Sequence, residues 1–235
     1  MRCITCRKLC TGLIRFFFIA CPSVALAIPT ITCHCFTDRS YDPARPTIAD
    51  PYFLASTQNS FFATVFAVEK KSIVMKKQQG TSNDDLWIAY WLAAKSGGDP
   101  ESLLVGRKSK GAWPKVATPL AIPDKSLGGR VAAALKTNAA DERLAEAVVD
   151  ELLLRFRFHG EPELTAMRKA GAGNQEMVLA GLLAARMRQP ATQLYRDVKN
   201  GKASWGALLE RAKIDPTAIE AEVARLVSAA PRSSS

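Results

Sequence analysis

Cysteine is absent from most of this sequence, because all six cysteines lie at or before Cys35 and the following 200 of the 235 residues contain none. Histidine is almost as scarce, with His34 near the N-terminus and His159 as the two in the chain. The main part of the chain therefore cannot hold a disulfide framework or a histidine-rich metal site.

Motifs of common catalytic sites are also absent. The chain has no Gly-x-Ser-x-Gly elbow, no His-Glu-x-x-His pair and no phosphate-binding glycine loop after a strand. Acidic pairs at 84–85 and 141–142 stand at predicted helix starts, where the helix dipole explains them. His159 is predicted to cap the end of a helix. We therefore expect no enzyme, and a helical hydrolase that uses an acidic pair is the weaker alternative.

The first 27 residues have the order of a secretory signal. Four basic residues and no acidic one occupy positions 1–15, positions 16–27 are uncharged, and the segment ends in Ala25-Leu26-Ala27. We expect cleavage after Ala27, which makes Ile28 the first residue of a protein exported to the periplasm or outside a bacterial cell. The net charge of +10 then falls, because 28 of the 32 basic residues remain against 22 acidic ones, to a mildly basic +6.

Two alternatives for this segment keep the protein at a membrane. The uncharged stretch 16–32 reaches the short limit of a membrane-spanning helix, so it could act as an uncleaved anchor. Phe18-Ile19-Ala20-Cys21 loosely resembles the lipobox of bacterial lipoproteins, which implies a lipid on Cys21. The basic balance of the remaining chain adds weak contact with an anionic membrane surface.

Cys33-His34-Cys35 is the candidate metal or redox site, in an irregular arm predicted over 28–49. Alternate residues of an extended segment point to the same side, so both sulfurs can face one copper or zinc ion, and His34 can serve a second molecule. The alternatives are a disulfide, within the pair or between two chains, and thiols without a role. Three residues are an incomplete ligand set for either metal.

The rest of the chain predicts an all-α domain over 50–228, with a disordered tail over 229–235. Asp50-Pro51 is typical of a helix start, with the carboxylate as the cap. Apolar residues recur at three- and four-residue spacing as far as Ile73, which indicates one helix that ends at Gly80. No segment alternates apolar and polar residues long enough to predict a strand.

Helical hairpins recur in three units, at about 86–135, 148–173 and 177–227. Each has an apolar helix, a Gly or Pro turn and a shorter helix with leucine and glycine seven residues apart. Four apolar positions of the first unit, beginning at Trp113, match four of the third, beginning at Trp205, at a constant offset of 92. The pattern predicts hairpins that stack on one another, because none buries its apolar face alone.

The third unit contains a segment that resembles a helix-turn-helix in spacing, from Ser204 to about Arg225. Its second helix carries Glu220 and Glu222, which would repel phosphates, so we expect no nucleic acid as partner. Trp113 and Trp205 each follow a basic, glycine-containing turn and are candidate binding residues, with a role as core anchors as the alternative.

The sequence thus predicts an exported, non-enzymatic helical protein of the cell envelope that binds another envelope protein. The alternative is a metal-handling or thiol-redox protein that works through Cys33, His34 and Cys35.

Overall fold

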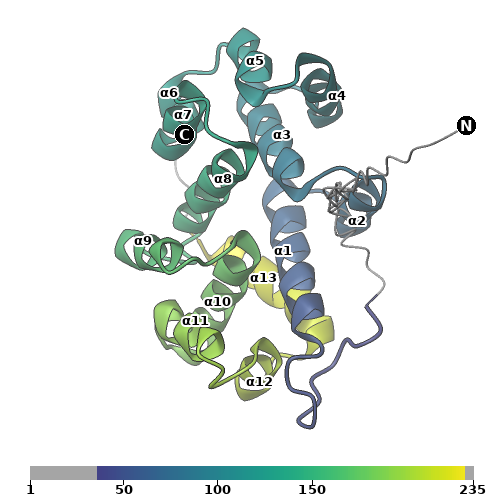
Figure 1. The fold of residues 1–235 in the computed structure, drawn as a ribbon, viewed down its shortest axis with the longest axis vertical. Coiled ribbons are helices and arrows are strands. Elements are labelled where there is room, and N and C mark those ends of the chain that lie inside the picture. Colours follow the sequence, from purple (N-terminus) through teal and green to yellow (C-terminus); the bar gives the residue numbers. More distant parts are fainter. Residues whose placement is uncertain (1–35, 231–235) are drawn as a thin grey trace, which may run out of the picture. The chain divides into compact units, whose positions relative to one another are not determined.

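The computed structural model describes residues 36–230, and these residues form helices without a β-strand among them, which confirms the all-α prediction for this part of the chain (Figure 1). The elements are α1 (Asp50–Phe66), α2 (Lys70–Gln78), α3 (Asn83–Ser96), α4 (Pro100–Lys110), α5 (Trp113–Ala117), η1 (Thr118–Leu120), α6 (Asp124–Leu127), α7 (Gly129–Lys136), α8 (Asp141–Arg155), α9 (Glu161–Lys169), α10 (Asn174–Met187), α11 (Ala191–Lys199), α12 (Trp205–Arg211), η2 (Pro216–Ala218) and α13 (Ile219–Ala229).

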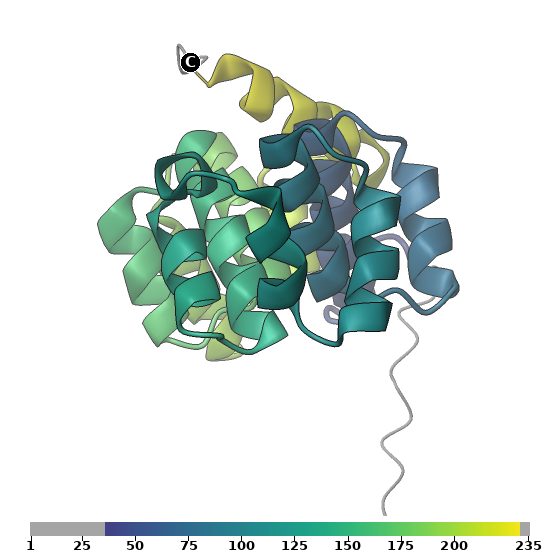
Figure 2. The same ribbon diagram turned by 90° about the horizontal axis from the view of Figure 1, so that it is seen from above.

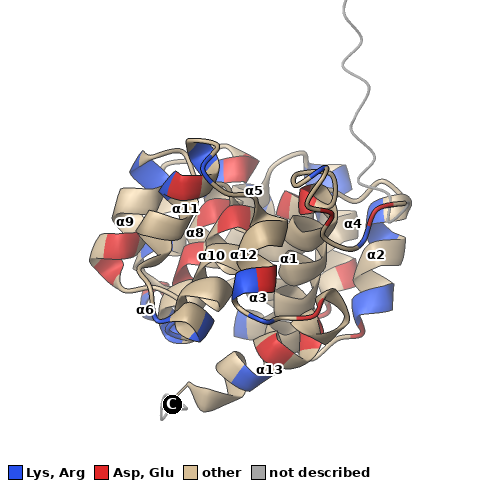
Figure 3. Ribbon diagram, turned by 90° about the horizontal axis from the view of Figure 1, so that it is seen from below, with Lys and Arg blue, Asp and Glu red and all other residues tan. Residues whose placement is uncertain are grey.

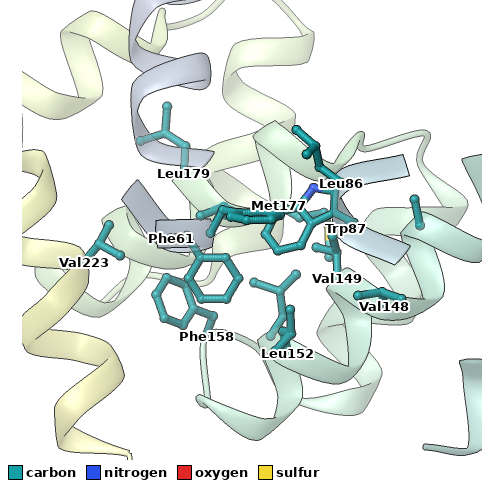
Figure 4. Packing of buried hydrophobic residues seen from close by; sticks show 14 of the residues in the cluster. Phe61, Leu86, Trp87, Val148, Val149, Leu152, Phe158, Met177, Leu179 and Val223 are labelled. Atoms are coloured by element: carbon teal, nitrogen blue, oxygen red, sulfur yellow. The ribbon is translucent and has the colours of Figure 1, made fainter. Parts of the chain in front are cut away.

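Four helices, α1, α3, α8 and α10, form the interior. Every residue over 86–93 of α3 and over 177–183 of α10 is buried, as expected for helices that are apolar on all sides. α3 packs against α8, and α10 packs against α1. Phe61 of α1 lies among Trp87, Leu152 and Met177 in the close-up of the core (Figure 4). The core therefore joins helices from distant parts of the chain.

Helix pairs occur at the three predicted units, as α3–α4, α8–α9 and α10–α11. A glycine with positive φ follows the second helix of each pair: Gly111 (75°), Gly171 (89°) and Gly201 (69°). A left-handed residue lets the chain leave a helix end, and glycine adopts it without a steric penalty. The superposition of these units in three dimensions, and hence the internal repeat, stays a prediction.

The single helix predicted from Asp50 to Gly80 is wrong, because the chain breaks between α1 and α2. Ala67 closes α1 in the left-handed region (φ 53°), and the Val68 N–H donates to the Ala63 carbonyl at 2.9 Å. The turn redirects α2 so that Ile73 becomes fully buried. The burial of Ile73 compensates for the free-energy cost of holding Ala67 in a left-handed conformation, which glycine adopts more easily.

The predicted role of Asp50 as the cap of its own helix is also wrong. Ala49 holds the N-cap position of α1 without a side-chain hydrogen bond, and Asp50 is the first helical residue. The Asp50 carboxylate accepts instead from the N–H groups of Trp205 and Gly206, at 3.1 and 2.8 Å. It therefore caps α12, a helix near the other end of the chain.

The ends of the described chain lie against this core. Residues 36–49 form turns, and Tyr41 approaches Gly206 closely. α13 packs against α1, and in Figure 2 it extends (yellow) along one edge of the array of helices. The helix reaches Ala229, the first residue of the tail predicted to be disordered, and residues 231–235 lie outside the described part.

Candidate functional site

A cavity of about 420 Å³ lies where the first turns of α3, α8 and α10 meet the side of α1. Its acidic lining side chains are Asp84, Glu142, Glu146 and Glu176, and we call the cavity with these four residues and Gln58 the acidic pocket. Leu54, Asn83, Gly173, Asn174 and Gln175 complete the wall. Figure 3 marks the acidic residues of α8 and α10 (red) among the Lys and Arg residues (blue).

Local helix chemistry explains why acidic residues stand here. Asp84, Glu142 and Glu176 each lie in the first turn of a helix, where a carboxylate is stabilised by the unpaired N–H groups and the dipole. Glu176 also accepts from the Gly173 N–H at 2.8 Å, which closes the start of α10. The packing of α3, α8 and α10 then brings their three N-terminal ends to one cavity. Carboxylates that each stabilise their own helix therefore lie around the same space.

The pKa of Asp84 is raised from 3.8 to about 6 in this pocket. Burial is the largest cause, and the like charges of Glu142, Asp85, Asp141 and Glu146 add to it. Asp84 and Glu142 form no ion pair within residues 36–230. A cation in the pocket would therefore offset repulsion that the described residues leave in place.

The two deeper acidic positions near the pocket are neutralised by arginines. Arg168 donates through Nε and Nη2 to Asp150 Oδ1, at 2.9 and 2.6 Å, and through Nη2 to Asn174 Oδ1 at 2.6 Å. Its Nη1 donates to the Ala172 carbonyl and lies 4.0 Å from Glu146 Oε1. Arg143 donates to the other oxygen of Glu146 at 2.6 Å. Asp84, Glu142 and Glu176 thus carry the charge that no basic residue of 36–230 compensates, and of these Glu176 accepts the Gly173 N–H.

Gln58 gives the pocket an acceptor that the described residues do not use. It is 2% exposed, it lines the cavity, and its Oε1 has no hydrogen-bond partner. A buried acceptor without a donor costs about 1–3 kcal/mol. Ser60 Oγ and Arg107 Nε are also buried without a partner, but neither residue lines the pocket. An N–H donor in the cavity would remove the cost at Gln58.

The structure places both predicted binding tryptophans in the core, as the first residues of α5 and α12. Trp113 is 0% exposed and donates through Nε1 to Asp85 Oδ1 at 2.9 Å, and Trp205 is 2% exposed. Neither lines the acidic pocket. Their burial favours the role as core anchors, and a role in ligand binding stays a prediction.

The remaining candidates fall elsewhere. Cys33, His34 and Cys35, the predicted copper or zinc ligands, lie outside the described residues, as do the signal and Cys21, so these predictions stay open. His159 is buried beside α10, where its Nε2 donates to the Met177 carbonyl at 2.7 Å and its Nδ1 lies 3.3 Å from Glu163 Oε2. It therefore contacts a neighbouring helix rather than the last carbonyls of α8.

Sequence reasoning identified two of these acidic residues and explained them by the helix dipole, but it missed Gln58, Glu146 and Glu176. A signal for Gln58 exists in the sequence. Ser56, Thr57, Gln58, Asn59 and Ser60 form a polar run inside an otherwise apolar helix, and all five are buried. Buried polar groups need partners, so such a run indicates either a packed polar network or a site.

Comparisons add no relative to this picture. No helix within residues 36–230 is long and apolar enough to cross a membrane. No protein-family model, no curated protein and no solved structure matches the chain.

Proposed function

We propose that this protein is an exported, non-enzymatic binding protein of the cell envelope, and that the acidic pocket holds a cationic group of its ligand or partner. One observation carries the proposal: Gln58, whose buried Oε1 has no donor, lines the same cavity as three carboxylates without an ion pair in residues 36–230, those of Asp84, Glu142 and Glu176. Acceptors of this kind favour a cation, and carboxylates without a compensating charge attract one over a distance.

Titration with simple cations tests the binding. Ca²⁺, Mg²⁺ and spermidine are each titrated into the full chain by isothermal calorimetry, at low ionic strength because salt screens such binding. We expect at least one of them to bind. The double variant Asp84→Asn/Glu142→Gln should bind that cation at least tenfold more weakly, about 1.4 kcal/mol.

A matched control separates the pocket from net charge. Asp124→Asn/Glu210→Gln removes the same number of charges from two exposed positions outside the pocket. This control should bind as the unchanged protein does. Equal losses in the two double variants, or no binding of any of the three cations, would contradict the proposal.

Export is tested by the intact mass of the protein from the envelope fraction. A chain that begins at Ile28 supports export with cleavage. A mass with lipid on Cys21 or with the complete N-terminus supports one of the two anchored alternatives. A full-length chain recovered from the cytoplasm alone would contradict the envelope part of the proposal and leave the pocket untouched.

A further inference from the structure

From the lining of the acidic pocket we infer that the cationic group is the ammonium or guanidinium end of an aliphatic chain, rather than a metal ion. This inference rests on the function proposed above and narrows it. The same chemistry is present in a free amine and in a lysine or arginine side chain of a partner protein.

The geometry of the carboxylates does not suit a metal. Within residues 36–230, no group of three or more His, Cys, Asp or Glu side chains is close enough to hold an ion. Ca²⁺ takes six to eight oxygen ligands at about 2.3–2.6 Å, and Mg²⁺ requires six at about 2.0–2.1 Å. The lining oxygens come from four different helices around about 420 Å³. That space exceeds the needs of a bare ion.

The wall offers an apolar surface next to the acceptors. Leu54 and Gln58 lie four residues apart on α1 and therefore share one face of that helix. Both line the pocket, and Leu54 is half-buried there. An aliphatic stem can contact Leu54 while its charged end reaches Gln58 Oε1, as long cationic side chains do elsewhere.

The acceptors of the pocket favour a cation with several N–H donors. An ammonium group offers three N–H donors and a guanidinium group five. The pocket supplies Gln58 Oε1 and the carboxylates of Asp84, Glu142 and Glu176, which accept nothing from charged groups of the described chain. A cation with N–H donors can pair with Gln58 Oε1 as well as with the carboxylates, whereas a cation without them compensates the charges and leaves Gln58 unpaired.

Calorimetry with the full chain and four probes tests this inference. The probes are agmatine, which carries a guanidinium on an alkyl chain, an arginine tripeptide with blocked ends, tetramethylammonium, which has no N–H donor, and Ca²⁺. We expect agmatine or the tripeptide to bind at least tenfold more tightly than tetramethylammonium. The tighter of the two indicates whether the natural source is a free amine or a side chain.

Two variants locate the contacts. Gln58→Met keeps the length of the side chain but removes the acceptor. It should weaken the binding of agmatine about fivefold to tenfold and leave the binding of tetramethylammonium unchanged. Leu54→Ser should weaken the binding of agmatine. Leu120→Ser, at a half-buried position outside the pocket, should leave that binding unchanged. Circular dichroism and the thermal midpoint establish that each variant is folded.

The outcomes separate this inference from the proposed function. Binding of Ca²⁺ that depends on Asp84 and Glu142, without binding of agmatine or the tripeptide, overturns the inference and leaves the proposed function standing. Tetramethylammonium that binds as tightly as agmatine overturns it as well, because Gln58 then has no role. If none of the four probes binds, the inference fails, and the proposed function fails with it when Mg²⁺ and spermidine do not bind either.

Discussion

The carboxylate of Asp50 accepts a hydrogen bond from the N–H of Gly206 at 2.8 Å, across 156 positions of the chain. The same carboxylate accepts from the N–H of Trp205 at 3.1 Å, so one side chain satisfies two donors at the start of α12. Burial raises the pKa of Asp50, and the two N–H groups act against that rise. The first residue of α1 thus fixes the start of a helix near the C-terminus.

Replacement of this cap should destabilise the fold. Asp50→Ala leaves the Trp205 and Gly206 N–H groups buried without an acceptor, and we expect a loss of about 2–3 kcal/mol in the free energy of unfolding. Urea denaturation measures it. The control is Asp99→Ala, which removes an exposed cap that accepts from the Ser102 N–H at 2.9 Å and should cost about 1 kcal/mol. Equal costs in the two variants would contradict the structural role of Asp50.

The close approach at Gly206 gives a second stability test. A Cβ on Gly206 would lie 2.8 Å from Tyr41 Cδ2 and 2.9 Å from Phe53 Cε2, and Phe53 is fully buried. Because these rings cannot both move away, Gly206→Ala should cost about 1–3 kcal/mol.

Gly106→Ala is the matched control for Gly206→Ala, since its Cβ would meet Val116 at an ordinary 3.7 Å. Gly106 lies inside α4, where alanine is the better helix former, so this change should stabilise the protein by about 0.5–1 kcal/mol. Opposite signs for the two substitutions support the packing described here. A neutral Gly206→Ala would show that residues 36–49 do not hold Tyr41 against α12.

How much of this fold the sequence predicts depends on how local each determinant is. The all-α class follows from apolar spacing, and the glycine after α4, α9 and α11 follows from helix-end chemistry, because both act within a few residues. The break at Ala67 has no glycine or proline to announce it. It is decided by the burial of Ile73 in a core assembled from other helices.

The candidate site was predictable only in its parts. The helix dipole explains Asp84 and Glu142 separately, but the convergence of three helix starts is a tertiary fact. Asp50 likewise has the sequence signature of a cap, and the helix that it caps begins more than 150 residues away. Local rules thus predicted the chemistry of these carboxylates, and packing determined their partners.

The left-handed alanine at the end of α1 predicts a stabilising substitution. Ala67 has φ 53°, a conformation that costs an L-residue about 1–2 kcal/mol and glycine very little. Ala67→Gly relieves that cost, but glycine also increases the entropy of the unfolded chain, which acts in the opposite direction. The net effect should be a rise of up to about 1 kcal/mol in the free energy of unfolding. Ala94→Gly, at an exposed position inside α3, should lower it by about 1 kcal/mol. The same sign for both would contradict the break at Ala67.

The raised pKa of Asp84 makes stability depend on pH in a defined window. The folded pKa of about 6 exceeds the ordinary 3.8, so between these values the folded protein holds more protons than the unfolded chain. The contribution of Asp84 to stability therefore falls as pH rises from about 4 to 6, by on the order of 2–3 kcal/mol. Asp84→Asn lacks this titration, and its advantage over the unchanged protein should grow through that window and level off above it.

Urea denaturation of both proteins at intervals from pH 3.5 to 7.5 measures that difference. Asp99 supplies a control of opposite sign, because hydrogen bonds from Ser102 lower its pKa. Asp99→Asn should therefore lose stability relative to the unchanged protein as pH rises through the acidic range, where Asp84→Asn gains. A stability difference for Asp84→Asn that is constant with pH would show that neither burial nor the charges of Glu142 and its neighbours raise the pKa of Asp84. The electrostatic argument for a cation in the acidic pocket would then fail with it.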